Sequence, residues 1–121
     1  MAFPTIQFKA TNTELNDTLT TLVEQKFETL DKYIGDETDV RCEVEFEKET
    51  AHQSGNFFRV EANLTIHGKL YRSSASEESF EKAIDTVRNE LDKEVRRASS
   101  KRETLIKKGG RMFKDMMRFG K

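Results

Sequence analysis

The residue types that most often carry catalysis are scarce in this chain. Cys42 is its single cysteine, and His52 and His67 are its two histidines. Cys42 falls among the apolar positions of a predicted strand, where a small buried thiol is ordinary, and neither histidine is placed to serve it as a base. Three such residues cannot form a disulfide framework or a four-ligand zinc site. The sequence therefore predicts neither an enzyme nor a bound metal or cofactor.

Four glutamates at alternating positions could be mistaken for a metal site or an acid–base pair. They are Glu43, Glu45, Glu47 and Glu49. Carboxylates two apart in a strand form a row and do not converge on one point, so we interpret them as a solvated sheet face. A strongly acidic face should repel RNA. A nucleic-acid partner would then bind mainly to the helix side and to the basic residues 92–121.

The two signs of charge are segregated along the chain. Residues 1–91 hold 10 Lys/Arg against 18 Asp/Glu, whereas residues 92–121 hold 11 against 4, for a net charge of -1 overall. Such a basic C-terminal quarter is typical of a protein with a polyanionic partner, either nucleic acid or an anionic membrane surface.

Cations four residues apart form a ridge in this basic quarter. Lys93, Arg97 and Lys101 have this spacing, with Arg96 beside them, and they point largely away from the apolar stripe of a predicted helix. A solvated helix face that interacts favourably with the helix dipole is the competing interpretation. The full predicted RNA-binding set is Lys26, Lys82, Arg88, Lys93, Arg96, Arg97, Lys101 and Arg102, with further contacts from Lys107, Lys108 and Arg111.

The elements that must position these cations follow from hydrophobic periodicity. Residues 6–10 alternate with period two and predict a strand. Thr11 and Glu14 fit a capping box at the start of a helix over residues 13–34, whose apolar stripe runs from Leu15 to Ile34. Gly35 then supplies the left-handed residue that commonly ends a helix.

The middle of the chain predicts three strands. Alternation begins after Asp39 and resumes at residues 58–67, with loop composition at residues 50–56 between. We expect a two-residue hairpin turn at Gly68-Lys69, which would pair Ile66 with Tyr71 and bury Tyr71, Ser73 and Ala75. Ser76 is the predicted N-cap of a long second helix, which we expect to extend beyond the packed domain.

These elements predict an α+β fold of order β-α-β-β-β-α. One four-stranded sheet would carry both helices on one face. The 121 residues suit a single domain, which we place at residues 1–104, followed by a basic tail over residues 105–121 that is flexible when unbound. In the tail, residues at helical spacing could form an amphipathic helix on RNA, a protein groove or a membrane: Met112, Phe113, Met116 and Met117. The chain has neither an apolar run long enough to span a bilayer nor the blocks of a signal peptide, so we expect a cytoplasmic protein without a membrane partner.

Two segments of this chain resemble the ribosome hibernation promoting factors, also called ribosome-associated inhibitors and, historically, sigma-54 modulation proteins. The first runs from Gln25 to Tyr33, and the second from Ser73 to Asp85, before a Lys/Arg-rich helix. The Ala83-Ile84-Asp85 signature follows an aromatic residue, Phe80, where the family usually carries tyrosine. The resemblance covers residues 4–104.

The resemblance implies a topology related to double-stranded-RNA-binding domains and a position in the decoding channel of the small ribosomal subunit, where the factor blocks mRNA and tRNA. It also implies that Lys26, Lys93, Arg97 and Lys101 contact ribosomal RNA, although Glu90 and Ser99 stand where members often have lysine. The chain lacks the dimerising domain of long members, so we expect a short form that is monomeric off the ribosome, with ribosomal proteins as further partners of the tail. The older family name leaves one alternative open, a protein-interaction module that modulates a transcription factor.

Overall fold

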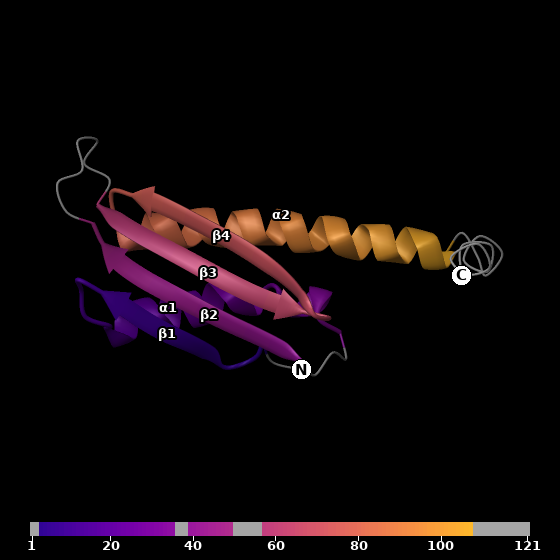
Figure 1. Cartoon of the computed structure of the whole chain (residues 1–121), viewed down its shortest axis with the longest axis horizontal. Helices are drawn as coiled ribbons and strands as arrows, with labels where there is room; N and C mark the ends of the chain where they lie inside the picture. Colours follow the sequence, from indigo (N-terminus) through magenta and orange to yellow (C-terminus); the bar gives the residue numbers. More distant parts are fainter. Residues whose placement is uncertain (1–2, 36–38, 50–56, 108–121) are drawn as a thin grey trace.

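The computed structural model describes residues 3–35, 39–49 and 57–107, the last seven by backbone alone. Its elements follow the order β-α-β-β-β-α (Figure 1), which confirms the predicted α+β fold. The bounds are β1 Ile6–Thr11, α1 Asp17–Glu28, the short 3-10 helix η1 Asp31–Tyr33, β2 Val40–Lys48, β3 Phe58–Ile66, β4 Lys69–Glu77 and α2 Phe80–Lys107. Within these residues no helix is both long and apolar enough to cross a bilayer.

The four strands form one mixed sheet in the order β1-β2-β3-β4. β1 and β2 are parallel because α1 crosses between them, whereas β2, β3 and β4 pair antiparallel through direct connections. Both helices lie behind the same face of the sheet in Figure 1, so the opposite face is open.

The core lies between the sheet and the two helices. Alternate strand residues point into it, among them Val44, Phe46, Val60 and Leu64, as the period-two pattern predicts. Phe46 is in ring contact with Phe80 of α2, at 5.4 Å between centroids. The buried stripe of α2 meets this layer and fixes how the helix lies across the sheet: Phe80, Ala83, Ile84, Val87, Leu91 and Val95.

The first helix is shorter than the sequence predicts. It begins at Asp17, where the Asn16 side chain accepts a hydrogen bond from the Leu19 backbone N–H at 2.8 Å, so the Thr11–Glu14 capping box is wrong. Asn12 turns the chain with a φ of 58°, a conformation that asparagine tolerates, and this separates β1 from the helix. The helix ends at Glu28 and continues as η1, while Gly35 has the expected positive φ of 63°.

The β3–β4 hairpin turns one residue earlier than predicted. His67 and Gly68 both have positive φ, 55° and 77°, so they form the turn and Ile66 pairs with Lys69 while Leu64 pairs with Tyr71. Two left-handed residues match the right-handed twist of the strands, and this selects His67-Gly68 over Gly68-Lys69. The faces of β4 are nevertheless as predicted, because the pairing shifts by two positions.

The second helix also begins later than predicted. β4 continues to Glu77, and Ser79 instead of Ser76 accepts a hydrogen bond from the Lys82 backbone N–H, at 3.2 Å. Ser76 instead donates its hydroxyl to Glu49 across the outer face. Among the α2 side chains that the structure describes, Val95 is the last buried one, and the helix then projects well beyond the sheet (Figure 1), as the sequence predicts.

Candidate nucleic-acid interface

The predicted RNA-binding cations divide into two groups along α2. The core stripe of α2 faces the sheet, so the opposite side of the helix presents its polar residues to solvent. Cations over the globule have acids or hydroxyls within reach. Lys93 and Arg97, further along the helix, have none among the residues that the structure describes, and this difference indicates which cations are available to a ligand.

Arg88, near the middle of α2, is held by several groups at once. Its Nε and Nη2 atoms donate to the Thr29 hydroxyl at 3.0 and 2.6 Å, which links α2 to the end of α1. Its Nη1 donates to Asn89 at 3.1 Å, and Asp92 lies 3.8 Å from Nη2. The Arg88 side chain is only 24% exposed, so it is part of the packing between the helices.

Lys26 and Lys82 are also paired. Lys26 on α1 makes an ion pair with Asp85 on α2, with 2.5 Å between Nζ and Oδ1, so it too bridges the two helices. Lys82 donates to Glu78 at 3.1 Å, and this hydrogen bond raises the Lys82 pKa above its usual value. The structure thus gives three members of the predicted set internal partners.

Lys93 and Arg97 differ from these three. Both are exposed, and neither forms a hydrogen bond or an ion pair with any other residue that the structure describes. Arg96 lies between them, with a 59% exposed side chain and only a 4.0 Å approach to Asp92. Together these residues present unsatisfied N–H donors on a helix that the core holds in place.

The remaining predicted cations lie further along the chain. Lys101, Arg102 and Lys107 are on the helical backbone of α2, which continues the line of Lys93 and Arg97 away from the sheet. Lys108 and Arg111 lie outside the described residues, as do the tail positions suggested for an amphipathic helix.

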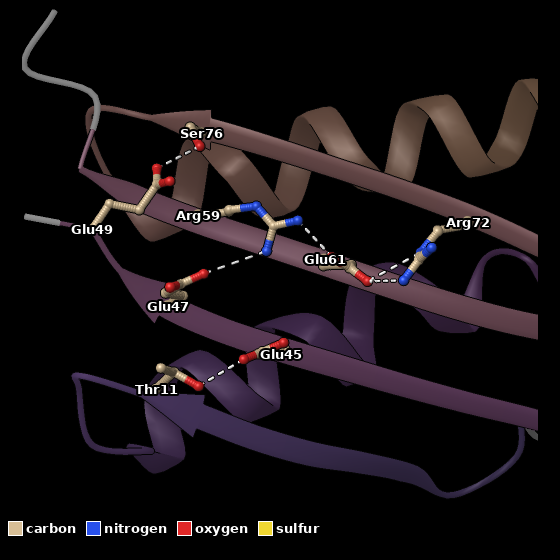
Figure 2. Close-up of polar contacts among 8 residues, drawn as sticks. All are labelled: Thr11, Glu45, Glu47, Glu49, Arg59, Glu61, Arg72 and Ser76. Atoms are coloured by element: carbon tan, nitrogen blue, oxygen red, sulfur yellow. Dashed lines mark hydrogen bonds and ion pairs between the residues drawn. The ribbon is translucent and has the colours of Figure 1, made fainter. Parts of the chain in front are cut away.

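The outer face of the sheet is less acidic than predicted. Among the described residues it carries five glutamates and four cations: Glu43, Glu45, Glu47, Glu49 and Glu61, with Lys9, Arg41, Arg59 and Arg72. Figure 2 shows Arg59 between Glu47 and Glu61, at 3.5 and 2.5 Å, and Arg72 bound to the same Glu61 at 2.9 Å. Hydrogen bonding from Arg59 holds the pKa of Glu61 below its usual value. The expectation of a strongly acidic face is therefore wrong, because four cations lie among the five glutamates and Arg59 pairs with Glu47 of the row.

Cys42 has the surroundings of a core residue. Its side chain is 1% exposed, and burial raises the pKa of the thiol to about 12, with a smaller contribution from the charge of Glu43. A nucleophilic thiol requires a lowered pKa and access to solvent. Cys42 has neither, whereas His67 lies at the hairpin turn.

The sequence contained part of the information that separates the two groups of cations. The spacing of Glu78 with Lys82 and of Arg88 with Asp92 is i,i+4, which favours ion pairs along a helix. The bridges from Lys26 to Asp85 and from Arg88 to Thr29 join residues 59 positions apart and depend on how α1 packs beside α2. No local pattern could identify those.

Comparison with known proteins gives a family and a fold. Residues 6–103 match the family model described as sigma 54 modulation protein / S30EA ribosomal protein. The chain is similar in structure to the N-terminal domain of Protein Y from Thermus thermophilus, with a TM-score of 0.65 and 24% identity over 75% of this chain and 93% of that domain. It is also similar to a ribosomal subunit interface protein from Coxiella burnetii, with a TM-score of 0.63 and 16% identity over 78% of this chain and 97% of that one. No curated protein sequence matches significantly.

Proposed function

The chain belongs to the sigma 54 modulation protein / S30EA ribosomal protein family, and on that premise we propose that it is a ribosome hibernation factor. It binds the small ribosomal subunit in the decoding channel and blocks mRNA and tRNA by occupying their place. The name of the Coxiella burnetii protein, a ribosomal subunit interface protein, supports a position between the two ribosomal subunits. Residues 1–104 form the binding domain in this proposal, and the cations of residues 105–121 add contacts to RNA or ribosomal proteins.

The observation that carries the proposal is that Lys93 and Arg97 have no partner among the described residues and lie on a helix fixed by the core. Folded RNA is recognised through phosphates, 2′-hydroxyls and shape, which requires cations at fixed spacing on a rigid support. One helical turn separates Lys93 from Arg97, and the buried stripe of α2 that ends at Val95 holds this part of the helix in place. Inhibition then needs only occupancy of the channel, and no chemical step.

Co-sedimentation of the full chain with purified small subunits tests the proposal. The triple variant K93E/R97E/K101E should bind on the order of 100-fold more weakly, because each change replaces a phosphate contact with a repulsive carboxylate. The matched control is K32E/K48E/K69E, which alters the net charge equally at exposed lysines that lie over the rings of Tyr33, Phe58 and Tyr71.

The control variant should retain most of its affinity for the small subunit. Equal losses in both triple variants would mean that only net charge matters, and would overturn the assigned site. A parent chain that fails to sediment with small subunits even at low salt would end the proposed function. A complex that forms with a transcription factor and resists nuclease would favour the alternative inherited from the family description.

A further inference from the structure

The outer face of the sheet contains two adjoining hollows, on the side away from α2. One has a volume of about 450 Å³ and the other about 320 Å³, and they share Gln7, Glu43 and Asn63. The strand register explains the shared residues, because Gln7 pairs with Glu43 across β1 and β2, and Glu43 pairs with Asn63 across β2 and β3. The hollows therefore centre on one cross-strand row.

Two hydrogen-bond acceptors without donors lie side by side in this row. The Asn63 Oδ1 atom is buried and accepts no hydrogen bond from the residues that the structure describes. The Glu43 carboxylate is exposed, and within the same part of the chain it forms neither a hydrogen bond nor an ion pair. Directly paired residues of antiparallel strands have their side chains in contact range. Asn63 and Glu43 can thus accept from neighbouring donors on one bound group once that group displaces the side chains that cover Asn63 Oδ1.

The other glutamates of this face already have partners. Glu45 accepts from the Thr11 hydroxyl at 2.6 Å, and Glu49 accepts from Ser76 at 2.7 Å (Figure 2). Glu47 and Glu61 are bound by Arg59 (Figure 2). Among these five carboxylates, Glu43 alone has neither a hydrogen bond nor an ion pair within the described residues.

The rim of the hollows has the opposite character. Arg41 lines the larger hollow and Lys9 the smaller one, and both are exposed cations without a partner in the described parts of the chain. A simple cation would meet these two charges, and a simple anion would meet Glu43. The fitting ligand has two adjacent donors for the centre and an anionic group for the rim.

A guanine nucleotide has this distribution of groups. The Watson–Crick edge of guanine presents its N1–H and N2 amino donors next to each other, and its phosphate can reach Lys9 or Arg41. Adenine and cytosine place an acceptor beside their amino group, which would face the oxygen atoms of Glu43 or Asn63. We propose that the outer sheet face binds an unpaired guanine nucleotide, in RNA or free, with Glu43 and Asn63 reading its donor edge. The proposal rests on the proposed function only in taking RNA as one source of the guanine.

Nuclear magnetic resonance of the labelled full chain tests this site without a ribosome. Titration with GMP should shift the amide signals of Gln7, Glu43 and Asn63. IMP lacks the N2 amino group and should bind about fivefold more weakly, for the loss of one hydrogen bond. AMP should leave these signals unchanged at the same concentrations.

Variants then separate the guanine contact from general charge effects. E43Q replaces one acceptor oxygen with an amide donor and should abolish the preference for GMP over AMP. E49Q removes the same charge from the same face outside the hollows, and should keep the preference. The dispersion of the spectra shows in each case whether the variant is folded.

Comparison of GMP with RNA identifies the source of the guanine. If a short single-stranded RNA with one guanine binds at least tenfold tighter than GMP, and E43Q weakens this binding, RNA is the source. Equal affinities identify the free nucleotide. Equal shifts from all the nucleotides, or no shifts, would overturn the proposal. Stronger binding of an N-acetylated arginine amide, whose guanidinium also presents adjacent N–H donors, would overturn it too. GMP preference in a chain that does not bind small subunits would refute the proposed function alone, and small-subunit binding without GMP preference would refute this site alone.

Discussion

The two parts of α2 use similar residues in different ways. Over the globule, Lys82 and Arg88 are bound by Glu78, Thr29 and Asp92, whereas Lys93 and Arg97 further along have no such partners in the described structure. The helix is continuous across both parts, and among these cations Arg88 alone reaches the end of α1, through Thr29, while Lys82 pairs with Glu78 just before the helix. The difference teaches that a cation on this helix belongs to the fold or to a ligand according to its tertiary neighbours.

Substitution of Arg88, in the part of α2 that lies over the globule, should lower the free energy of unfolding the most. R88A removes three hydrogen bonds and leaves Asp92, whose side chain is 15% exposed, without its nearest cation. We expect the free energy of unfolding to fall by about 2 kcal/mol, because the largely buried Asp92 carboxylate loses its nearest cation and α2 loses its link to Thr29. R97A should change it by less than about 0.5 kcal/mol, as an exposed substitution usually does. Chemical denaturation of both variants measures this, and equal values would remove the distinction between the two parts.

The Cys42 thiol offers an independent measure of the same contrast. Because Cys42 is 1% exposed, a thiol reagent should reach it only when the chain opens, so R88A should speed labelling about 30-fold and R97A should leave the rate unchanged.

The pH dependence of stability follows from burial of the same thiol, which raises the Cys42 pKa to about 12 in the folded state from 9.0. The unfolded chain ionises first, so stability is retained below about pH 9 and decreases as the pH rises towards 12. Rapid labelling of the parent chain in native buffer would contradict the burial.

Lys93 and Arg97 should dominate the salt dependence of binding. K93Q and R97Q should each reduce the slope of log affinity against log salt by about one, because each removes one phosphate contact. K82Q should reduce it by less, since Glu78 already occupies that lysine. Filter binding or sedimentation with small subunits at several salt concentrations gives the slopes. A K82Q effect as large as that of R97Q would show that pairing does not withhold a cation from RNA.

The bridge between Lys26 and Asp85 should have the smallest effect. Their side chains are 38% and 52% exposed, so a double-mutant cycle of K26A and D85A should give a coupling energy of about 0.5 kcal/mol. The exchanged pair K26D/D85K should recover part of it. If K26A instead weakens small-subunit binding as strongly as R97A does, Lys26 contacts RNA directly, as the family resemblance implies.

Much of the fold could be predicted because its signals are local and periodic. The alternation of Val44 and Phe46 and the helical stripe from Phe80 to Val95 specify faces that burial alone decides. The errors lie at boundaries, where Asn16, Ser79 and the His67-Gly68 turn compete with equally plausible neighbours for the same cap or turn. Those choices depend on tertiary packing and strand twist.

The candidate site was predictable in composition but not in detail. The sequence identified the basic residues of α2, yet it could not separate Arg88 from Arg97, because Thr29 is 59 positions away from Arg88 along the chain. The mixed charge of the sheet face was missed for the same reason, since Arg59 reaches Glu47 only after β2 and β3 are paired, and Arg72 reaches Glu61 only after β3 and β4 are paired. Spacing within one element predicts which residues share a face, and pairing between elements decides what they do.

A density map of the full chain bound to the small ribosomal subunit tests the central claim most directly. The account predicts that the chain lies in the decoding channel with Lys93 and Arg97 against ribosomal RNA phosphates, while Arg88 stays turned towards Thr29. A map that places the second part of α2 in solvent, or the chain outside the path of mRNA and tRNA, would contradict it.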